Sequence, residues 1–306
     1  MQHSSLGGRE MYAELRSPNV HEPHNLAEFT NTIISYKDNA TSLWAGGTYI
    51  MSQKDFYPSK SANVEIISLQ NIEELKHFQR NDRFAEFGSM VSLSKIQSVG
   101  ALLLPKVLIK TIDKTATTTI RNRITIGGCL CTPSFRTPLA STLMLLDANV
   151  EVRYLKKRMH SKWLGISRIY DKNGGLALLP NALLSRIRIP IQQFDYQYFN
   201  AAGSPLREAN TSVSLAAVAK MEQSSISTGK MIITIPNKGF CQSRDIDNIF
   251  SSLQFPCDEG HLSSFFSYII TYIRENLGEI DQLQEVRLKG MLSEMINELN
   301  QKSLSV

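Results

Sequence analysis

Two glycine pairs are the residues of this sequence that are suited, by their type and position, to bind a ligand. The first pair lies in Ala45-Gly46-Gly47-Thr48, directly after Ser42–Ala45, which we predict to be a short buried strand. Consecutive glycines let the backbone approach a ligand closely, and their N–H groups can point together at an anion. The hydroxyl of Thr48 could add a hydrogen bond to a phosphate oxygen. An ordinary turn between a strand and a helix explains Gly-Gly-Thr equally well.

The second pair, Gly127-Gly128, follows the threonine-rich segment 115–126, which we predict to be extended. The hydroxyls of this segment could bond a sugar or a phosphate. The two pairs are about 80 residues apart, and two such loops could hold the two sides of a dinucleotide's pyrophosphate. Neither loop has the G-x-G-x-x-G or the G-x-x-x-x-G-K-[ST] pattern, so the sequence excludes a Rossmann fingerprint and a P-loop.

Four cysteines raise the question of a metal site or a disulfide framework. Cys129 and Cys131 are two residues apart, whereas Cys241 and Cys257 are isolated. This spacing matches neither the paired C-x-x-C of a zinc site nor the cysteine run of an iron–sulfur protein. We therefore expect no metal bound by this chain and four reduced, mostly buried thiols.

The composition is that of an ordinary globular protein. Of 306 residues, 42% are hydrophobic and 20% are charged, and the net charge is +5. These values exclude collagen-like, disordered and disulfide-scaffold chains, and at roughly 100–200 residues per domain they predict two domains. So small a basic excess argues against a nucleic-acid binder. No apolar run approaches the ~18 residues of a membrane span, and no signal segment is apparent, so we expect a soluble, cytoplasmic protein.

The elements that position the two glycine loops follow from hydrophobic periodicity and capping. We predict a helix over His24–Tyr36, because Asn25 can cap it and Glu28 stands three residues later as the capping-box partner. Further strands are expected over Asn63–Leu69, Arg83–Ser89, Asn149–Leu155 and Arg186–Ile191, further helices over Ser92–Ser98, from Pro105 onward and over Pro138–Leu146, and turns over residues 156–182.

The pattern changes after about residue 195. Three strands are predicted over Phe194–Phe199, Thr211–Met221 and Lys230–Pro236, and three helices over Arg244–Leu253, Leu262–Leu277 and Glu285–Leu299. Strands first and helices afterwards are typical of a separate α+β domain. We therefore expect one domain over residues 1–195 and a second over residues 196–306.

The two glycine loops, in this order, resemble a known family. Ala45-Gly46-Gly47-Thr48 followed by Ile120-Arg121-Asn122-Arg123-Ile124-Thr125-Ile126-Gly127-Gly128 is similar to the pattern of the FAD-binding medium subunit of the molybdenum hydroxylases, the xanthine dehydrogenase family. The resemblance covers nearly the whole chain and includes Phe87–Ser92, Leu139–Val152, Ile187–Pro190 and Val286–Leu292. It implies an α+β fold: a two-lobed FAD-binding domain of the para-cresol methylhydroxylase type, followed by a smaller α+β domain with a three-stranded sheet and helices.

The resemblance also implies which residues hold the FAD. Residues 45–50 would wrap the pyrophosphate, Ala116 and Thr117 would lie near the adenosine arm, and Leu184 would lie near the ring system. The cofactor-binding residues expected in this way are Ala45, Gly46, Gly47, Thr48, Tyr49, Ile50, Ala116, Thr117, Thr125, Gly127, Gly128, Cys129, Thr132 and Leu184. No catalytic side chain is expected, because the flavin itself carries the electrons.

The implied function is that of an electron-transfer flavoprotein subunit. It would take electrons from [2Fe-2S] clusters on a small partner subunit and pass them through FAD to NAD or another acceptor. A large molybdopterin-binding subunit would oxidise the organic substrate, so this sequence does not specify that substrate. This sequence has no cysteines at the spacing of an iron–sulfur site, which agrees with [2Fe-2S] clusters that are bound by a partner subunit. The alternatives are a scaffold subunit of the same fold without a cofactor, and a free-standing FAD-dependent reductase.

The sequence departs from the family pattern at several positions of the expected site. Tyr49 and Cys129 stand where the family has Asp and Asn, and Ile124 stands where it has Gly. The segment 132–136 is shortened and lacks a carboxylate, and residues 199–201 lack a basic residue. Backbone contacts to a pyrophosphate would survive these changes. Side-chain contacts, worth about 0.5–1.5 kcal/mol each, would not. Tyr49 could cover a flavin or adenine edge, or fill part of the cofactor space.

Overall fold

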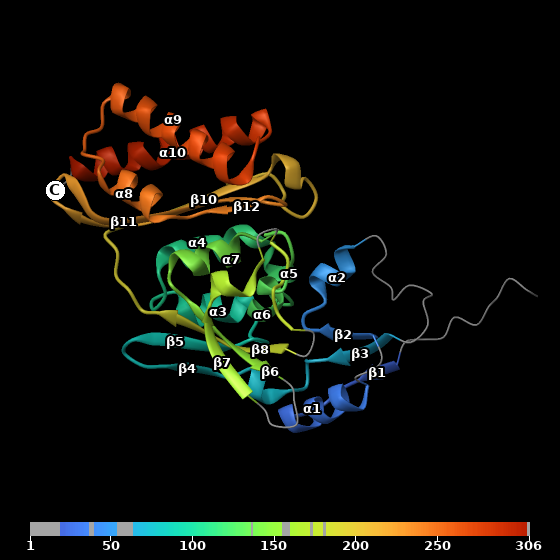
Figure 1. Ribbon diagram of the computed structural model, residues 1–306. Coiled ribbons are helices and arrows are strands. Elements are labelled where there is room, and N and C mark those ends of the chain that lie inside the picture. Colours follow the sequence, from blue (N-terminus) through green and yellow to red (C-terminus); the bar gives the residue numbers. More distant parts are fainter. Residues whose placement is uncertain are drawn as a thin grey trace, which may run out of the picture.

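The chain stacks two sheets and two sets of helices, with a small lobe at one side (Figure 1). The computed structural model describes residues 19–36, 40–53, 64–135, 137–154, 160–171, 174–179 and 182–304. Arg136 therefore lies outside the described residues. None of the helices within these ranges is long and apolar enough to cross a membrane.

The small lobe contains a three-stranded parallel sheet and the predicted first helix. Its strand order is β1 (Asn19–His21), β3 (Val64–Ser68), β2 (Ala40–Trp44). The side chain of Asn25 caps α1 (Leu26–Ser35) by accepting a hydrogen bond from the N–H of Glu28. The Glu28 carboxylate accepts one in return from the N–H of His24, at 2.8 Å. Both the helix and its cap were predicted correctly.

The central lobe is a five-stranded antiparallel sheet covered on one face by helices. Its strand order is β4 (Phe78–Arg80), β5 (Phe84–Gly88), β8 (Ala182–Pro190), β6 (Asn149–Tyr154), β7 (His160–Gly165). Ile187 and Ile189 of β8 are buried in the core, whereas the alternating Arg186 and Arg188 are partly exposed on the other face. The covering helices are α3 (Leu93–Gly100), α4 (Lys106–Thr115), α5 (Thr118–Arg121), α6 (Ile126–Leu130) and α7 (Pro138–Leu145).

Two expectations for this lobe were wrong. The threonine-rich segment 115–126 is not extended, because residues 118–121 form α5. Threonine favours strands only weakly, and here the contacts of Arg121 with the end of α4 override that preference. Residues 156–182 were expected to be turns, yet they contain β7, which pairs with β6 at the edge of the sheet. The outer residues of β7 are exposed and polar, so its sequence carries little hydrophobic signal.

The second sheet begins at β9, directly after residue 195, and lies between two layers of helices. Its order is β12 (Gly239–Cys241), β11 (Ser225–Ile235), β10 (Val213–Glu222), β9 (Tyr196–Ala202). The three predicted strands and three predicted helices are present, and β12 is a short fourth strand. The helices are α8 (Arg244–Ser251), α9 (Glu259–Leu277) and α10 (Gln282–Ser303). The predicted α+β class is confirmed.

Both faces of the second sheet are buried, which joins it to the central lobe. On β10, Leu215 and Ala217 belong to the core beneath the C-terminal helices, whereas Ala216 and Val218 belong to the core that includes α4 and α7. Figure 1 shows α4 and α7 between the two sheets. This contact brings the loop after β9 close to the glycine loops.

Candidate functional site

A cavity of about 910 Å³ lies where the two glycine loops meet. Ligand sites typically measure about 300–1,000 Å³. Every residue expected from the sequence to bind the cofactor lines this cavity: Ala45, Gly46, Gly47, Thr48, Tyr49, Ile50, Ala116, Thr117, Thr125, Gly127, Gly128, Cys129, Thr132 and Leu184. The structure therefore brings together residues from the small lobe, the central helices and the start of β8.

The first glycine pair joins the two loops and starts α2 (Thr48–Ser52). A Cβ atom on Gly46 would lie 1.8 Å from the carbonyl oxygen of Arg123, so the two loops pack backbone to backbone here. Gly47 has φ +72°, a left-handed conformation, and a Cβ atom there would have no neighbour closer than 4.0 Å. Among the residues that the structure describes, no side chain caps α2. The first N–H groups of a helix have no partner within it. These N–H groups are the backbone donors that the first loop offers.

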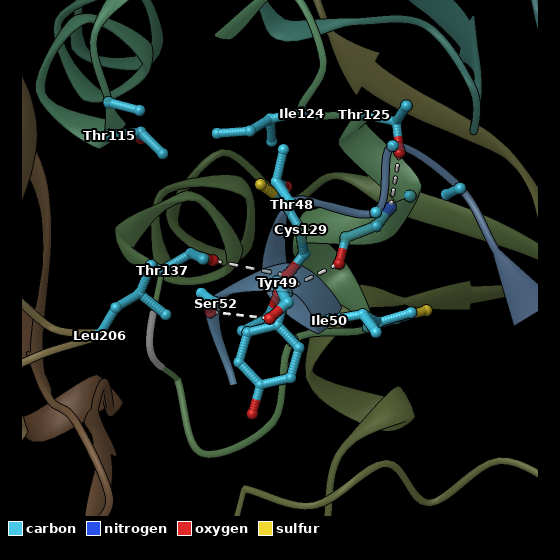
Figure 2. A pocket seen from close by; sticks show the side chains of 18 of the residues that line it. Thr48, Tyr49, Ile50, Ser52, Thr115, Ile124, Thr125, Cys129, Thr137 and Leu206 are labelled. Carbon is cyan, nitrogen blue, oxygen red and sulfur yellow. Dashed lines mark hydrogen bonds between the residues drawn. The ribbon is translucent and has the colours of Figure 1, made fainter. Parts of the chain in front are cut away.

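The second glycine pair uses its N–H groups inside the protein. The N–H of Gly127 donates to the carbonyl of Ser89 at 2.8 Å, and the N–H of Gly128 donates to Oγ1 of Thr125 at 3.1 Å (Figure 2). A Cβ atom on Gly127 would lie 2.6 Å from Cβ of Ser89. This pair therefore shapes the cavity by close packing and does not supply backbone donors to it.

The cavity has three further walls that the sequence did not indicate. They are the turn after β5 with Ser89 and Met90, a group of leucines before and at the start of β8, and the loop between β9 and β10. The leucines are Leu176, Leu178, Leu179 and Leu183, and the loop contributes residues 203–207. The leucines lie in or just after a segment expected to be turns, and the loop belongs to the second sheet. Neither has a motif that could have revealed it.

The charges and hydroxyls of the lining suit an anionic ligand. Lys114 and Arg207 line the cavity, and no carboxylate does so within the part of the chain that the structure describes. Oγ of Ser89 is buried and has no hydrogen-bond partner among the residues that the structure describes. The apolar wall of leucines lines the same cavity. Such a lining fits a ligand that has a flat apolar ring system and a negatively charged arm.

The cysteines at the site do not provide a reactive thiol pair. Cys129 is buried, and burial, with a smaller contribution from the neighbouring Cys131, raises the pKa of its thiol to about 12. Its thiol therefore stays protonated and acts as a small apolar group. Cys131 is exposed and Cys241 is buried, and all four cysteines are free of disulfides.

Tyr49 occupies the cavity without pairing to the second loop. Its carbonyl accepts a hydrogen bond from Oγ of Ser52 at 2.7 Å. Figure 2 shows its ring pointing away from Thr115, Ile124 and Thr125. Tyr49 thus forms part of the cavity wall on the side away from these three residues.

Arg121, within the second loop, holds the end of α4 and does not face a ligand. Its Nη1 donates to the carbonyls of Asp113 and Ala116 at 2.9 and 2.7 Å, and its Nη2 donates to Oγ1 of Thr118. The side chain is 8% exposed. A buried guanidinium at the C-terminal end of a helix satisfies carbonyls that would otherwise lack partners.

We expect Arg121→Met to lower the free energy of unfolding by about 2 kcal/mol, since hydrogen bonds from a charged donor are worth about 1.5–3 kcal/mol. Urea unfolding followed by circular dichroism measures this loss. Arg123→Met is the control, because the Arg123 side chain is exposed two residues away. Equal unfolding midpoints for both variants would contradict the anchoring role of Arg121.

The chain matches one family over more than half its length. The family is described as the FAD binding domain in molybdopterin dehydrogenase, and residues 14–192 match it. A stretch of 152 residues is 28% identical to an indole-3-acetaldehyde oxidase of Zea mays, and it covers 47% of this chain and 10% of the oxidase. The chain thus spans about a tenth of the length of the curated relatives that it matches.

Solved structures share the fold over most of the chain. A Cu,Mo-CO dehydrogenase has a TM-score of 0.75 and 16% identity, over 92% of this chain and 97% of that chain. Quinoline 2-oxidoreductase from Pseudomonas putida 86 has a TM-score of 0.75 and 18% identity, over 94% of this chain and 98% of that chain. At these identities the likeness establishes the architecture.

Proposed function

Since this chain belongs to the FAD-binding family of the molybdopterin dehydrogenases, as its sequence indicated, we propose that it is the flavoprotein subunit of a molybdenum-hydroxylase-like complex. Residues 1–195 would form the FAD-binding domain and residues 196–306 the second domain. The match to the family ends at residue 192, close to that boundary. One observation carries the proposal: both glycine loops, the leucine wall and two cations converge on one cavity.

The residues of the cavity divide into those for the anionic arm and those for the ring system. The N–H groups at the start of α2 and the hydroxyl of Thr48 would bind the pyrophosphate. Lys114 and Arg207 would balance its charge. Leu184 and the leucine wall would exclude water from the ring system, and the buried hydroxyl of Ser89 is free to donate to a bound group. When bound, FAD supplies the electron-transfer chemistry.

The partners and the direction of electron flow are part of the proposal. Electrons would come from [2Fe-2S] clusters on a small subunit and leave to NAD or another acceptor, while a large subunit carries the molybdopterin. The proteins of the same fold whose names support this are a Cu,Mo-CO dehydrogenase and a quinoline 2-oxidoreductase. We also propose that the complex is cytoplasmic.

A cofactor-free scaffold subunit is the second candidate. Tyr49 and Cys129, which replace the acid and the amide of the family pattern, favour it because both line the cavity and Cys129 presents only an apolar thiol. Against it stands the size of the cavity, which neither side chain fills. A free-standing reductase of the same fold is the third.

The absorbance spectrum of the purified protein tests the proposal. We expect a yellow protein that releases FAD on denaturation, in about one equivalent per chain. A protein that stays colourless after incubation with excess FAD would establish the scaffold instead. Co-purification with a molybdopterin subunit and a [2Fe-2S] subunit separates the complex from a free-standing reductase.

A further inference from the structure

We propose that the first turns of α10 position the loop that closes the FAD cavity, with Gln284 and Arg287 as the positioning residues. The loop, residues 203–207, is called the cavity lip here. The inference rests on the proposed function only in that the ligand is FAD. Gln284 and Arg287 do not line the cavity, and their hydrogen bonds to the loop are to its far end, residues 209–212.

The cavity lip is part of a compact loop between β9 and β10. The N–H groups of Arg207 and Glu208 donate to the carbonyl of Ser204 at 3.1 and 2.7 Å. Oγ of Ser212 donates to the carbonyl of Glu208 at 2.8 Å. These hydrogen bonds tie the cavity lip to residues 209–212, so a shift at the far end of the loop moves the lip.

The far end of the loop is held by α10. Nε2 of Gln284 donates to the carbonyls of Ser212 and Ala209 at 2.9 and 3.3 Å. Nη1 of Arg287 donates to the carbonyl of Thr211 at 2.6 Å. Three backbone carbonyls of residues 209–212 thus accept hydrogen bonds from two side chains of one helix. Together these contacts form the α10 anchor.

Two observations show that the α10 anchor is closely packed. Gln284 is 1% exposed, and its Oε1 accepts a hydrogen bond from the N–H of Asp281, which completes the capping box of α10. The amide therefore cannot turn away from the loop. A Cβ atom on Gly203 would lie 2.9 Å from Nη1 of Arg287. The guanidinium therefore packs beside Gly203, the first residue of the lip, and also donates to Thr211 at the far end of the loop.

The cavity lip places an apolar side chain at the mouth of the cavity. Leu206 is 43% exposed and lines the cavity from a segment separate from those that carry Thr48 and Thr125 (Figure 2). FAD in the cavity would cover part of this apolar side chain, and burial of apolar area is favourable. The second domain would in this way control how readily the cofactor leaves and how much water reaches it.

The test compares Arg287→Met and Gln284→Met with Lys289→Met. Lys289 lies on the same helix and pairs with Glu285 at 2.8 Å on its exposed side, so it is a matched control. The first measurement is hydrogen–deuterium exchange of the amides of residues 203–212 without added FAD. The second is the rate of FAD release, together with quenching of the bound flavin's fluorescence by iodide.

In both anchor variants we expect the loop amides to exchange hydrogen for deuterium faster than in the wild type. We also expect FAD release to be about tenfold faster and iodide quenching of the bound flavin to be stronger. Lys289→Met should match the wild type in all three measurements. A tenfold change corresponds to about 1.4 kcal/mol, close to the worth of one or two hydrogen bonds. Arg287→Lys, which keeps one donor, should recover part of the loss. Leu206→Ser, on the lip itself, should raise quenching without disturbing α10.

Each result has a distinct meaning. Unchanged loop exchange in both anchor variants would overturn the anchor. Faster exchange with FAD release and quenching equal to those of Lys289→Met would overturn the role of the lip while the proposed function stands. A wild-type protein that takes up no FAD would overturn the proposed function and with it the role of the lip in retaining FAD, and the exchange data would still decide whether α10 holds the loop.

Discussion

Gly46→Ala should lower the affinity for FAD at least about 100-fold, the largest effect that we expect of any single substitution on cofactor binding. The new Cβ atom would lie 1.8 Å from the carbonyl oxygen of Arg123 and 2.9 Å from its carbonyl carbon. Both neighbours are backbone atoms, so the clash can be relieved only by separating the two loops. A shift of that kind opens the cavity between them, and overpacking typically costs about 1–3 kcal/mol or more.

Gly47→Ala is the informative control for this prediction. Its new Cβ atom would meet no atom closer than 4.0 Å, so only the positive φ of +72° opposes the substitution. A left-handed conformation costs an alanine about 1–2 kcal/mol, which predicts a loss of FAD affinity of about tenfold. Equilibrium titration with FAD measures both values, and unfolding without FAD separates binding from folding. Wild-type affinity in Gly46→Ala would show that the loops do not pack as described.

Arg186→Met should lower the free energy of unfolding at pH 7 by about 3–5 kcal/mol, because it removes one partner of a buried ion-pair network. Arg186 bridges two carboxylates on the outer face of the central sheet: Nη1 lies 2.7 Å from Glu86, and Nε lies 2.8 Å from Glu151. The side chains of Glu86 and Glu151 are only 2% and 4% exposed. Without Arg186, the buried Glu151 carboxylate loses the two hydrogen bonds that Arg186 donates to it. The buried Glu86 carboxylate loses one and keeps those from Arg188.

The pH dependence gives this prediction a second readout. Burial alone would raise the pKa of Glu151, but hydrogen bonds from Arg186 and Ser185 and the charges of Arg153 and Arg186 outweigh it and lower the pKa to about 2. A lowered folded-state pKa means that the stabilisation is present above the unfolded pKa of about 4.5 and is lost as the pH falls toward 2. Linkage puts this loss at about 3 kcal/mol in the wild type.

Arg186→Met should lose less stability on acidification than the wild type, because only Ser185 and Arg153 then lower the pKa of Glu151. Urea unfolding at pH 7 and pH 3 measures the difference. Arg80→Met, an exposed arginine of β4 in the same sheet, is the control and should behave like the wild type at both pH values. A variant that loses as much stability as the wild type between pH 7 and pH 3 would contradict the role of Arg186.

Much of the fold could be predicted from the sequence wherever the signal is local. The side chain of Asn25 caps α1, and alternating isoleucines define β8, because these patterns depend on neighbouring residues only. Glu28 completes no capping box, since its carboxylate accepts from the N–H of His24 and not from that of Asn25. The family motifs also identified residues that the structure gathers around one cavity. β7 escaped prediction because a strand at the edge of a sheet with a polar face has almost no hydrophobic pattern.

The functional details of the site depend on contacts between residues far apart in the sequence. The two glycines of the first loop are indistinguishable as a dipeptide, yet Gly46 packs on Arg123 and Gly47 faces open space. The N–H groups of the second pair looked available for a ligand, but Ser89 and Thr125 take them. No local pattern contains this information, because it depends on which backbone atoms folding brings within a few ångströms.

The sequence by itself thus determined the family, the α+β class, most of the helices and strands and part of the lining of the cavity. Only the tertiary structure decided which glycine the site cannot lose, which N–H groups remain for a ligand, and that a helix of the second domain holds the lip of the cavity. The physical reason is the separation along the sequence over which each kind of interaction acts. Capping and periodicity act over a few residues, whereas steric exclusion and hydrogen-bond partnership at the cavity join segments up to about 80 residues apart in sequence.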